Sequence, residues 1–197
     1  EKKIQKVQIP LLKYFWQASP LSFSKKDNLP RFLRTLSVFK NFSDNELRIL
    51  STHMHRRSFE QKEVIFKQND LAIGFYFIYR GRVDILLNKD VDDTDLENTE
   101  KTRKIITLER GHYFGELSLL QENSIRNASA VARENTELIG VFRPDVDELI
   151  QFQPLVAAKL LQSISQIIAR RFFSLTLEVR ELRDKLYRYE NSEREET

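Results

Sequence analysis

The chain has 197 residues, 41% of them hydrophobic and 31% charged, which is the composition of an ordinary soluble globular protein. Its length suits one domain with extensions better than two full domains. No apolar run approaches the roughly 18–20 residues of a membrane-spanning helix, and no signal-peptide core follows the first residues. The chain has no cysteine, which excludes disulfides, thiolate zinc sites and cysteine nucleophiles and favours a cytoplasmic location.

Basic residues are concentrated at the N-terminal end. Residues 1–40 carry nine lysines and arginines against two acids, residues 41–153 carry fifteen against twenty, and residues 154–197 carry eight against seven. The net charge of +3 therefore does not describe a uniformly basic surface for nucleic acid. A helix-turn-helix would need far more than the eight residues that follow Tyr189, so we expect no nucleic-acid partner for this chain.

Residues 1–30 are predicted to form a basic, aromatic arm. Pro10, Pro20 and Pro30 divide it, and each discourages helix at the residue before it. Residues 11–16 are apolar and are flanked by lysines. We favour an arm that packs on the domain or on a second subunit; the alternative is a segment that docks on a membrane surface or a partner.

A helix is predicted from Ser43, because Ser43 and Glu46 form a capping box and Leu47, Leu50 and Met54 follow at helical spacing. After residues 55–57 the hydrophobic period changes to two, which indicates short strands. The strands are expected at residues 58–59, 64–66, 75–79, 82–87, 104–108, 129–131 and 138–142.

Residues 88–103 are predicted to form a loop that is rich in Asp, Asn and Thr. Five acids in this loop suggest a calcium site: Asp90, Asp92, Asp93, Asp95 and Glu97. The loop lacks the central glycine and the terminal glutamate spacing of a calcium-binding hand, so we prefer a solvated loop.

Two helices are predicted after the last strand. One begins near Pro144 and ends near Phe152; the second begins at Pro154, and no Gly or Pro interrupts it from Leu155 onward. This order of elements suggests a compact all-β roll on which helices pack. The expected segments are the arm at 1–30, a domain at 31–153 and a long C-terminal helix at 154–197.

The long helix carries a seven-residue hydrophobic repeat. Its apolar positions alternate in steps of four and three: Ile168, Phe172, Leu175, Val179, Leu182, Leu186 and Tyr189. In a parallel pair the flanking charges Glu178 with Arg183, and Lys185 with Glu190, attract each other. We predict a homodimeric coiled coil through Phe172, Leu175, Val179, Leu182 and Leu186, with packing on the helix's own domain as the alternative.

The segment with ligand-binding chemistry is 111–120, Gly-His-Tyr-Phe-Gly-Glu-Leu-Ser-Leu-Leu. It indicates a strand end followed by one helical turn, whose unpaired N–H groups favour an anion. Arg126 follows eleven residues after Gly115, ahead of the small-residue run at 127–131. An arginine beside such a turn can hold one phosphate, and Glu116 can accept a hydrogen bond from a ribose hydroxyl. These features together suggest a nucleotide with a single phosphate.

At these residues the chain resembles the cyclic nucleotide-binding domain family of catabolite-activator-like regulators and protein kinase A regulatory subunits. The similarity covers about residues 32 to 189 and includes 41–44, 63–66, 75–83, 114–120 and 126–128. It implies a mainly β fold with helices: a double-stranded β-helix, or jelly-roll-like β-roll, with an N-terminal helix and a long C-terminal helix. It also implies that binding, with cAMP or cGMP as ligand and no cofactor, is transmitted through the C-terminal helix dimer.

The resemblance implies a set of binding residues. Arg126 would hold the cyclic phosphate and Glu116 the 2′-hydroxyl, and the backbone of Gly115, Leu117, Ser118, Asn127 and Ala128 would complete the cradle. The chain departs from the family at Lys62 and Asn69, which replace turn glycines, and at Ile125, which replaces a proline. Asn127 leaves the base preference open, and Ser174 or Thr176 could contact the base.

These residues also allow other interpretations. Arg126 and Glu116 could form a plain buried ion pair in a ligand-free structural module that dimerises an attached membrane protein or enzyme. His53, His55 and His112 make a poor metal set, because the first two lie two residues apart on one predicted helix. The chain contains no hydrolase elbow, phosphate-binding lysine loop or dinucleotide motif, so we expect no catalysis.

Overall fold

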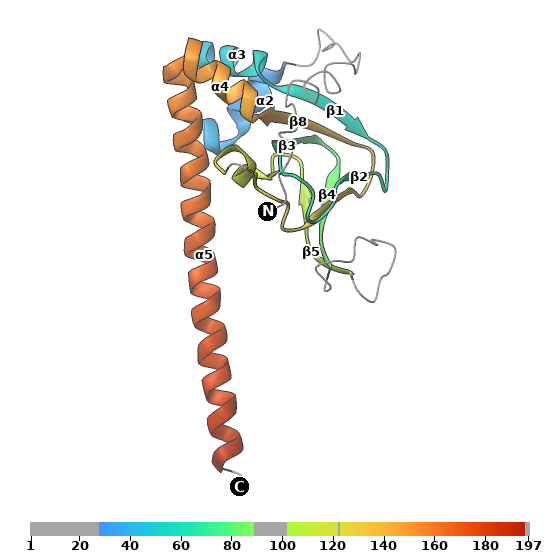
Figure 1. Ribbon diagram of the computed structural model, residues 1–197, viewed down its shortest axis with the longest axis vertical. Helices are drawn as coiled ribbons and strands as arrows, with labels where there is room; N and C mark the ends of the chain where they lie inside the picture. Colours follow the sequence, from blue (N-terminus) through green and yellow to red (C-terminus); the bar gives the residue numbers. More distant parts are fainter. Residues whose placement is uncertain (1–27, 89–101, 122, 196–197) are drawn as a thin grey trace, which may run out of the picture.

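A computed structural model describes residues 28–88, 102–121 and 123–195. Residues 1–27 of the predicted arm, and the five acids considered for calcium, lie outside the described residues. A β-roll stands beside a group of helices, and α5 continues far past the roll (Figure 1). The elements run in the order α2 (Leu29–Thr35), η1 (Ser37–Phe39), α3 (Asp44–Thr52), β1 (His55–Phe59), β2 (Val64–Phe66), β3 (Gly74–Arg80), β4 (Arg82–Asn88), β5 (Thr102–Glu109), β6 (Tyr113–Phe114), η2 (Glu116–Leu119), β7 (Ser129–Ala132), β8 (Thr136–Phe142), α4 (Arg143–Phe152) and α5 (Pro154–Glu195).

The described strands form two antiparallel sheets of four strands each. One sheet has the order β1-β8-β3-β6 and the other the order β2-β7-β4-β5. The sheets face each other across a core of Phe59, Tyr76, Ile78, Val83, Phe114, Ala130, Ala132 and Leu138. The predicted β-roll is confirmed, and each of the seven predicted strands overlaps an observed strand.

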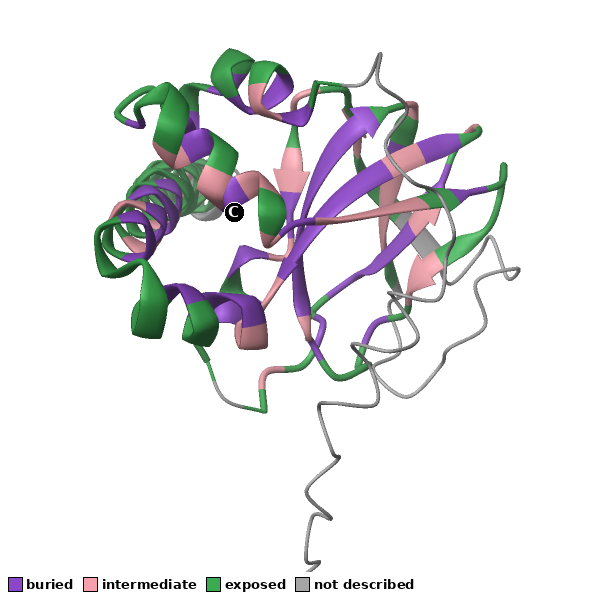
Figure 2. Cartoon of the chain, turned by 90° about the horizontal axis from the view of Figure 1, so that it is seen from above, coloured by how far each residue is buried: buried purple, intermediate pink, exposed green. Residues whose placement is uncertain are grey.

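The helices cover the outer face of the β1-β8-β3-β6 sheet. Successive side chains of a strand point to opposite faces, so Phe75 and Phe77 of β3 pack against the helices while Tyr76 and Ile78 pack between the sheets. Both faces of β3 are therefore buried, which explains its continuous apolar sequence. Figure 2 shows the helices gathered on one side of the roll, with their buried residues turned toward it.

The capping box predicted at the start of α3 is present. The Ser43 N–H donates to Oε2 of Glu46 over 2.7 Å, and Oγ of Ser43 accepts from the Glu46 N–H over 3.3 Å. The helix ends at Thr52, earlier than the apolar spacing to Met54 indicated. The prediction that His53 and His55 share a helix is wrong, because His53 caps α3 and His55 opens β1.

Three other boundaries differ from the sequence predictions. The strand β6 was not predicted, because two residues are too few to show a period. The expected loop at 88–103 is shorter, because β4 includes Asn88 and β5 begins at Thr102. The helix α2 begins at Leu29, a core residue, so the expected boundary at residue 31 falls inside a helix.

Three described non-glycine residues have left-handed backbone conformations: Asn123, and two that lie in the turns on either side of β2, Lys62 and Asn69. Lys62 has φ = 67° and Asn69 has φ = 70°. Both stand where the family resemblance expects glycine. Asparagine adopts this region more readily than lysine does, so Lys62 is the more strained residue.

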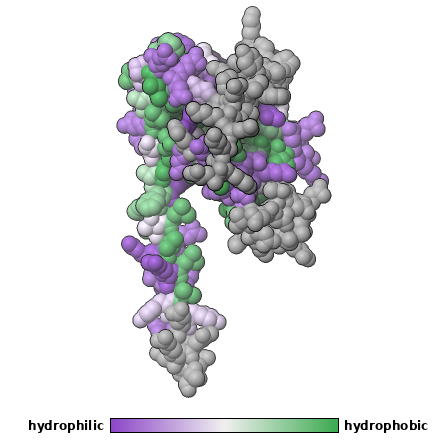
Figure 3. Space-filling view, viewed as in Figure 1, coloured by the Kyte–Doolittle hydropathy of each residue, from purple (hydrophilic) through white to green (hydrophobic). Residues whose placement is uncertain are grey.

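The helix α5 divides into a packed and an exposed half. Val156, Leu160, Ile164 and Ile167 lie in the helical core, and Ile168 packs partly against it. From Phe172 onward, the apolar residues of the repeat are exposed and are not buried by any other described residue. Phe172 itself is 71% exposed. Figure 3 shows hydrophobic surface along the part of α5 that extends past the roll. No helix among the described residues is long and apolar enough to cross a membrane.

Candidate functional site

The turn after β6 is formed by Gly115 and the short 3₁₀ helix η2. Gly115 has φ = 82°, a conformation that favours glycine. The Ser118 N–H and the Ser118 hydroxyl both donate to the carbonyl oxygen of Gly115, over 3.2 Å and 2.7 Å. Ser118 is buried while the side chain of Leu117 is exposed. The helical turn thus lies where the sequence predicts it, directly after Gly115. The N–H and the hydroxyl of Ser118 both donate hydrogen bonds inside this turn, so neither points to a ligand.

Arg126 lies beneath this turn and is only 5% exposed. Its Nη2 donates to the carbonyl oxygen of Gly74 over 2.9 Å, and its Nε is buried without a hydrogen-bond partner. Its Cζ lies 4.0 Å from the ring centroid of Phe66 and 5.5 Å from that of Tyr76. Burial lowers the pKa of the Arg126 guanidinium, against the raising effects of Tyr76 and of two nearby carboxylates. An arginine nevertheless stays protonated, so a positive charge is held in an aromatic surrounding.

Glu116 is 4% exposed, and its partner is not the one that the sequence suggested. Nη1 of Arg171, on α5, donates to its Oε1 over 2.5 Å. The other carboxylate oxygen, Oε2, is buried without a partner. The alternative of a direct Arg126–Glu116 ion pair is therefore not what this structure contains, because the carboxylate pairs with the helix.

The segment after Arg126 lies against the turn between β2 and β3. The Arg126 N–H donates to the Asp70 carbonyl and its carbonyl accepts from the Asn69 N–H, each over 2.8 Å. Asn127 is exposed, whereas Ala128 is buried. These two backbone hydrogen bonds hold Arg126 against the turn that precedes β3.

The structure brings two predicted segments together and adds residues that were not predicted. Gly115 packs against the Arg126 side chain, although the two lie eleven residues apart. Gly74, Phe66 and Tyr76 surround Arg126, and Arg171 completes the contacts of Glu116. The alternating pattern of β3 and the basic pair at 170–171 are visible in the sequence. Neither feature indicates that Tyr76 contacts Arg126 or that Arg171 contacts Glu116.

The two side chains suggested for a base contact differ in their positions. Ser174 lies three residues after Arg171, so it is on nearly the same face of α5 as the side chain that reaches η2. Thr176 lies about 140° away around the helix, and its hydroxyl donates to the Phe172 carbonyl over 2.9 Å. Ser174 is therefore the better placed of the two within one chain.

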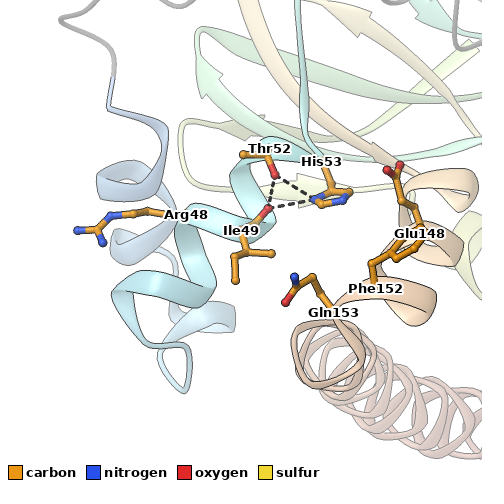
Figure 4. Close-up of a pocket in the computed structure, with 7 residues that line it drawn as sticks. All are labelled: Arg48, Ile49, Thr52, His53, Glu148, Phe152 and Gln153. Atoms are coloured by element: carbon orange, nitrogen blue, oxygen red, sulfur yellow. Dashed lines mark hydrogen bonds between the residues drawn. The ribbon is translucent and has the colours of Figure 1, made fainter.

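No metal site is found among the described residues, where no three potential ligands cluster. The Glu109 N–H donates to Nδ1 of His112 over 3.1 Å. His53 lines a hollow of about 390 Å³ between α3, α4 and the start of α5, where its Nδ1 lies 3.0 Å from the Ile49 carbonyl oxygen (Figure 4). This hollow shares no residue with the Gly115–Arg126 site.

A buried guanidinium that has no carboxylate partner among the described residues, at the edge of a β-roll beside a long helix, suits the binding of an anion. Residues 56–152 match the family model described as the cyclic nucleotide-binding domain. The β-roll of this chain belongs to that family.

Similar proteins agree with this assignment. The cyclic AMP receptor protein of Thermus thermophilus is 35% identical over 142 residues, which cover 72% of this chain and 60% of the relative. The crystal structure of Thermus thermophilus catabolite activator protein has a TM-score of 0.59 at 34% identity, and the match covers 74% of this chain and 62% of that one. Human cGMP-dependent protein kinase 2 is 22% identical, with 86% of this chain and 23% of the kinase covered. The chain spans less than two thirds of each.

Proposed function

We propose that this chain is a regulatory domain that binds a cyclic nucleotide, cAMP or cGMP, and transmits binding through α5 to a second copy. It performs no catalysis itself. Its expected compartment is the cytoplasm, and its N-terminal arm is the expected point of any membrane contact. The names of two relatives, a cyclic AMP receptor protein and a cGMP-dependent protein kinase, support a cyclic purine nucleotide as the ligand.

The observation that best supports this proposal is that Arg126 is buried without an anionic partner among the described residues. No carboxylate of the described residues forms an ion pair with it, its Nε is unpaired, and it is 5% exposed. Burying a charge in this way is costly for stability unless a partner arrives. A cyclic phosphate carries one negative charge and would supply that partner without a metal ion.

The two ends of the ligand would contact different parts of the site. Arg126 would hold the phosphate, and the backbone of Gly115, Leu117, Asn127 and Ala128 would line the cradle. The unpaired Oε2 of Glu116 is a buried acceptor that a ribose 2′-hydroxyl can fill. Ser118 contributes through its position in the turn, since its N–H already donates to Gly115.

The homodimer would form along the exposed half of α5. Phe172, Leu175, Val179, Leu182 and Leu186 are between 51% and 71% exposed, and they follow the coiled-coil repeat. Nζ of Lys185 is 2.7 Å from Oε1 of Glu181 on its own helix, an exposed pair that contributes little to stability. The apolar repeat would therefore provide most of the binding energy.

Transmission would follow from a population shift. Ligand would draw η2 toward its phosphate, and Leu119 of η2 packs in the same core as Val146 and Leu149 of α4. A change in η2 would thus move α4 and then α5. Of the states available to the helix, the ligand would favour the one that closes over the base.

The test is calorimetry with cAMP and cGMP on wild-type protein, Arg126→Ala and Arg126→Met. Micromolar affinity corresponds to about 8 kcal/mol, and a charge-assisted hydrogen bond contributes roughly 1.5–3 kcal/mol. Both variants should weaken binding by about ten- to several-hundredfold. Arg133→Ala, which removes an exposed arginine, is the control and should bind as wild type does.

Thermal unfolding of the same proteins separates a binding role from a structural one. Methionine keeps the packing on Phe66 but removes the buried charge, so Arg126→Met should be at least as stable as wild type. Equal nucleotide affinities of wild type and Arg126→Met would sink the role of Arg126. Wild-type protein that binds neither nucleotide, and releases none when denatured, would favour the ligand-free structural module.

A further inference from the structure

The guanidinium of Arg126 lies over the face of an aromatic ring. Its Cζ atom is 4.0 Å from the ring centroid of Phe66 and 5.5 Å from that of Tyr76, and the whole residue is buried. A cation over a ring face is attracted by the electrons of the ring, and the attraction is stronger where water is excluded. Since no carboxylate of the described residues forms an ion pair with Arg126, its contacts are these two rings and the carbonyl oxygen of Gly74.

The ring of Phe66 is held in place by two other rings. Its centroid is 5.8 Å from that of Phe114 and 6.2 Å from that of Tyr76, and the centroids of Phe114 and Tyr76 are 5.5 Å apart. Phe114 and Tyr76 are buried in the core between the two sheets, and Phe66 packs against that core. Rings that pack on one another in a close-packed core have little freedom to turn. Phe66 therefore presents a fixed face to Arg126.

The segment that supplies Phe66 also holds the backbone of Arg126. Phe66 ends β2, and the turn after it forms two hydrogen bonds with Arg126: the Asn69 N–H donates to the Arg126 carbonyl, and the Arg126 N–H donates to the Asp70 carbonyl, each over 2.8 Å. At the start of β3, the carbonyl oxygen of Gly74 accepts from Nη2 of Arg126 over 2.9 Å. The main chain and the side chain of Arg126 are thus both fixed by one stretch of chain, from the end of β2 to the first residues of β3.

The ring covers a face of the guanidinium and leaves its edge available. The N–H groups of a guanidinium lie in its plane, so a ring over the face does not compete with an acceptor for them. Nη2 of Arg126 donates to the Gly74 carbonyl, whereas Nε is buried without a hydrogen-bond partner. Arginine binds phosphate best through neighbouring N–H groups of this edge. The position of the Phe66 ring therefore determines the plane in which the oxygen atoms of a phosphate must lie.

We propose that Phe66 is a positioning residue for the anionic group of the ligand: its ring holds the guanidinium of Arg126 in the binding orientation before the ligand arrives. The inference rests on the proposed function. A binding group that adopts its competent orientation for only a fraction of the time lowers the affinity by that fraction. A carboxylate could also hold Arg126, but a phosphate would have to displace it. The ring can stay in contact while the phosphate binds at the edge of the guanidinium.

The first experiment compares Phe66→Leu, Phe66→Tyr and Phe59→Leu by calorimetry with cAMP and cGMP. Phe59 is the matched control, because it lies in the same core and its ring is 4.8 Å from Cζ of a different arginine, Arg57. Phe66→Leu should lower the affinity by about three- to thirtyfold, the value of a desolvated contact between a cation and a ring. Phe66→Tyr keeps the ring and should bind within about twofold of wild type, as should Phe59→Leu.

Urea unfolding of the ligand-free proteins tests the contact without nucleotide, as a double-mutant cycle. Phe66→Leu should cost more stability in wild type than in an Arg126→Met background, where no charge remains to be held. The difference should correspond to about three- to thirtyfold in the unfolding equilibrium constant. Phe59→Leu should cost the same in both backgrounds. An equal cost of Phe66→Leu in both would overturn the proposal, since the ring would then contribute packing only.

The two measurements separate a failure of the inference from a failure of the proposed function. If wild-type protein binds no cyclic nucleotide, the proposed function fails and the positioning role of Phe66 fails with it, whatever the unfolding shows. If wild-type protein binds while Phe66→Leu and Phe59→Leu have equal affinities, only the inference about Phe66 fails. A tighter-binding Phe66→Leu would also overturn it, since the ring would then hold Arg126 away from the ligand.

Discussion

A Cβ atom on Gly115 would lie 2.5 Å from Nη1 of Arg126 and 2.8 Å from the carbonyl oxygen of Gly74. Gly115 also has φ = 82°. The turn and the arginine are therefore packed so closely that no side chain fits at residue 115. The absence of a side chain at residue 115 is what allows the guanidinium to lie under the turn.

The first prediction concerns this close approach. Gly115→Ala should lose at least about tenfold in cyclic nucleotide affinity, because the methyl group displaces a charge-assisted contact. Gly111→Ala is the control: Gly111 also has positive φ, at 87°, but a Cβ there would be 3.8 Å from its nearest neighbour. Both variants should lose about 1–2 kcal/mol of stability from the backbone. Equal nucleotide affinities of the two, measured by calorimetry, would contradict the role of Gly115.

The second prediction concerns the unpaired oxygen of Glu116. If Oε2 holds the ribose 2′-hydroxyl, wild-type protein should bind cAMP about tenfold more tightly than 2′-deoxy-cAMP, which is the value of one hydrogen bond to a charged group. Glu116→Ala should bind the two ligands nearly equally. Calorimetry with both ligands on both proteins gives the answer. Discrimination that survives in Glu116→Ala would place the recognition of the hydroxyl on another residue.

Local patterns allowed much of the fold to be predicted. The capping box at Ser43 and Glu46 and the uninterrupted sequence after Pro154 depend on neighbours in the chain, and both predictions agree with the structure. The contacts of the site do not depend on neighbours. Arg126 meets a carbonyl 52 residues away, and Arg171 meets a carboxylate 55 residues away. Residue type and spacing predicted an anion-binding role for Arg126 and gave no role to Arg171, because only the packing of the sheets and of α5 determines the partners of both side chains.

The third prediction concerns backbone strain at Lys62. A φ of 67° destabilises the folded state of a residue with a Cβ by about 1–2 kcal/mol. Glycine removes this strain, but part of the gain in stability is lost because glycine has more conformational freedom in the unfolded chain. Lys62→Gly should therefore stabilise by about 0.5–1 kcal/mol, which raises the melting temperature by about 2–4 °C per kcal/mol. Asn69→Gly should gain less, because asparagine tolerates this region. A lower melting temperature for Lys62→Gly in calorimetric scans would contradict the strain.

The fourth prediction concerns acid stability and the pair Glu46–Lys159, which joins α3 to α5. Nζ of Lys159 lies 2.7 Å from both carboxylate oxygens. The hydrogen bond from Lys159 lowers the pKa of Glu46 below its ordinary 4.5, helped by the backbone bond from Ser43. A carboxyl whose pKa is lower in the folded state stabilises fully above the unfolded value and loses this contribution as pH falls through the folded value.

Urea unfolding at a series of pH values from about 7 down to about 3 measures this contribution. Glu46→Gln retains the acceptor for the capping box but cannot titrate, so its unfolding free energy should fall less steeply below pH 4.5 than that of wild type. Lys159→Met should flatten the same part of the curve. Identical slopes in all three proteins would show that the pair does not contribute to acid stability.

The last prediction concerns the exposed repeat of α5. Leu182 is 57% exposed and lies at a seam position, whereas Leu177 is 48% exposed and lies at an outer position of the same repeat. Leu182→Glu would place two like charges opposite each other in a desolvated seam and should give monomers. Leu177→Glu introduces the same charge into the same helix on the outer face and should stay dimeric.

Light scattering at tens of micromolar protein measures the association. Circular dichroism shows whether the β-roll stays folded, which we expect because its core contains no residue from the exposed half of α5. The flanking charges are each worth only about 0.2–1 kcal/mol when exposed, so they cannot hold the pair once the seam is disrupted. A wild-type monomer would defeat the dimer proposal. A Leu182→Glu protein that remains dimeric with a folded roll would place the contact elsewhere, and deletion of residues 1–27 would then test the basic, aromatic arm as that contact.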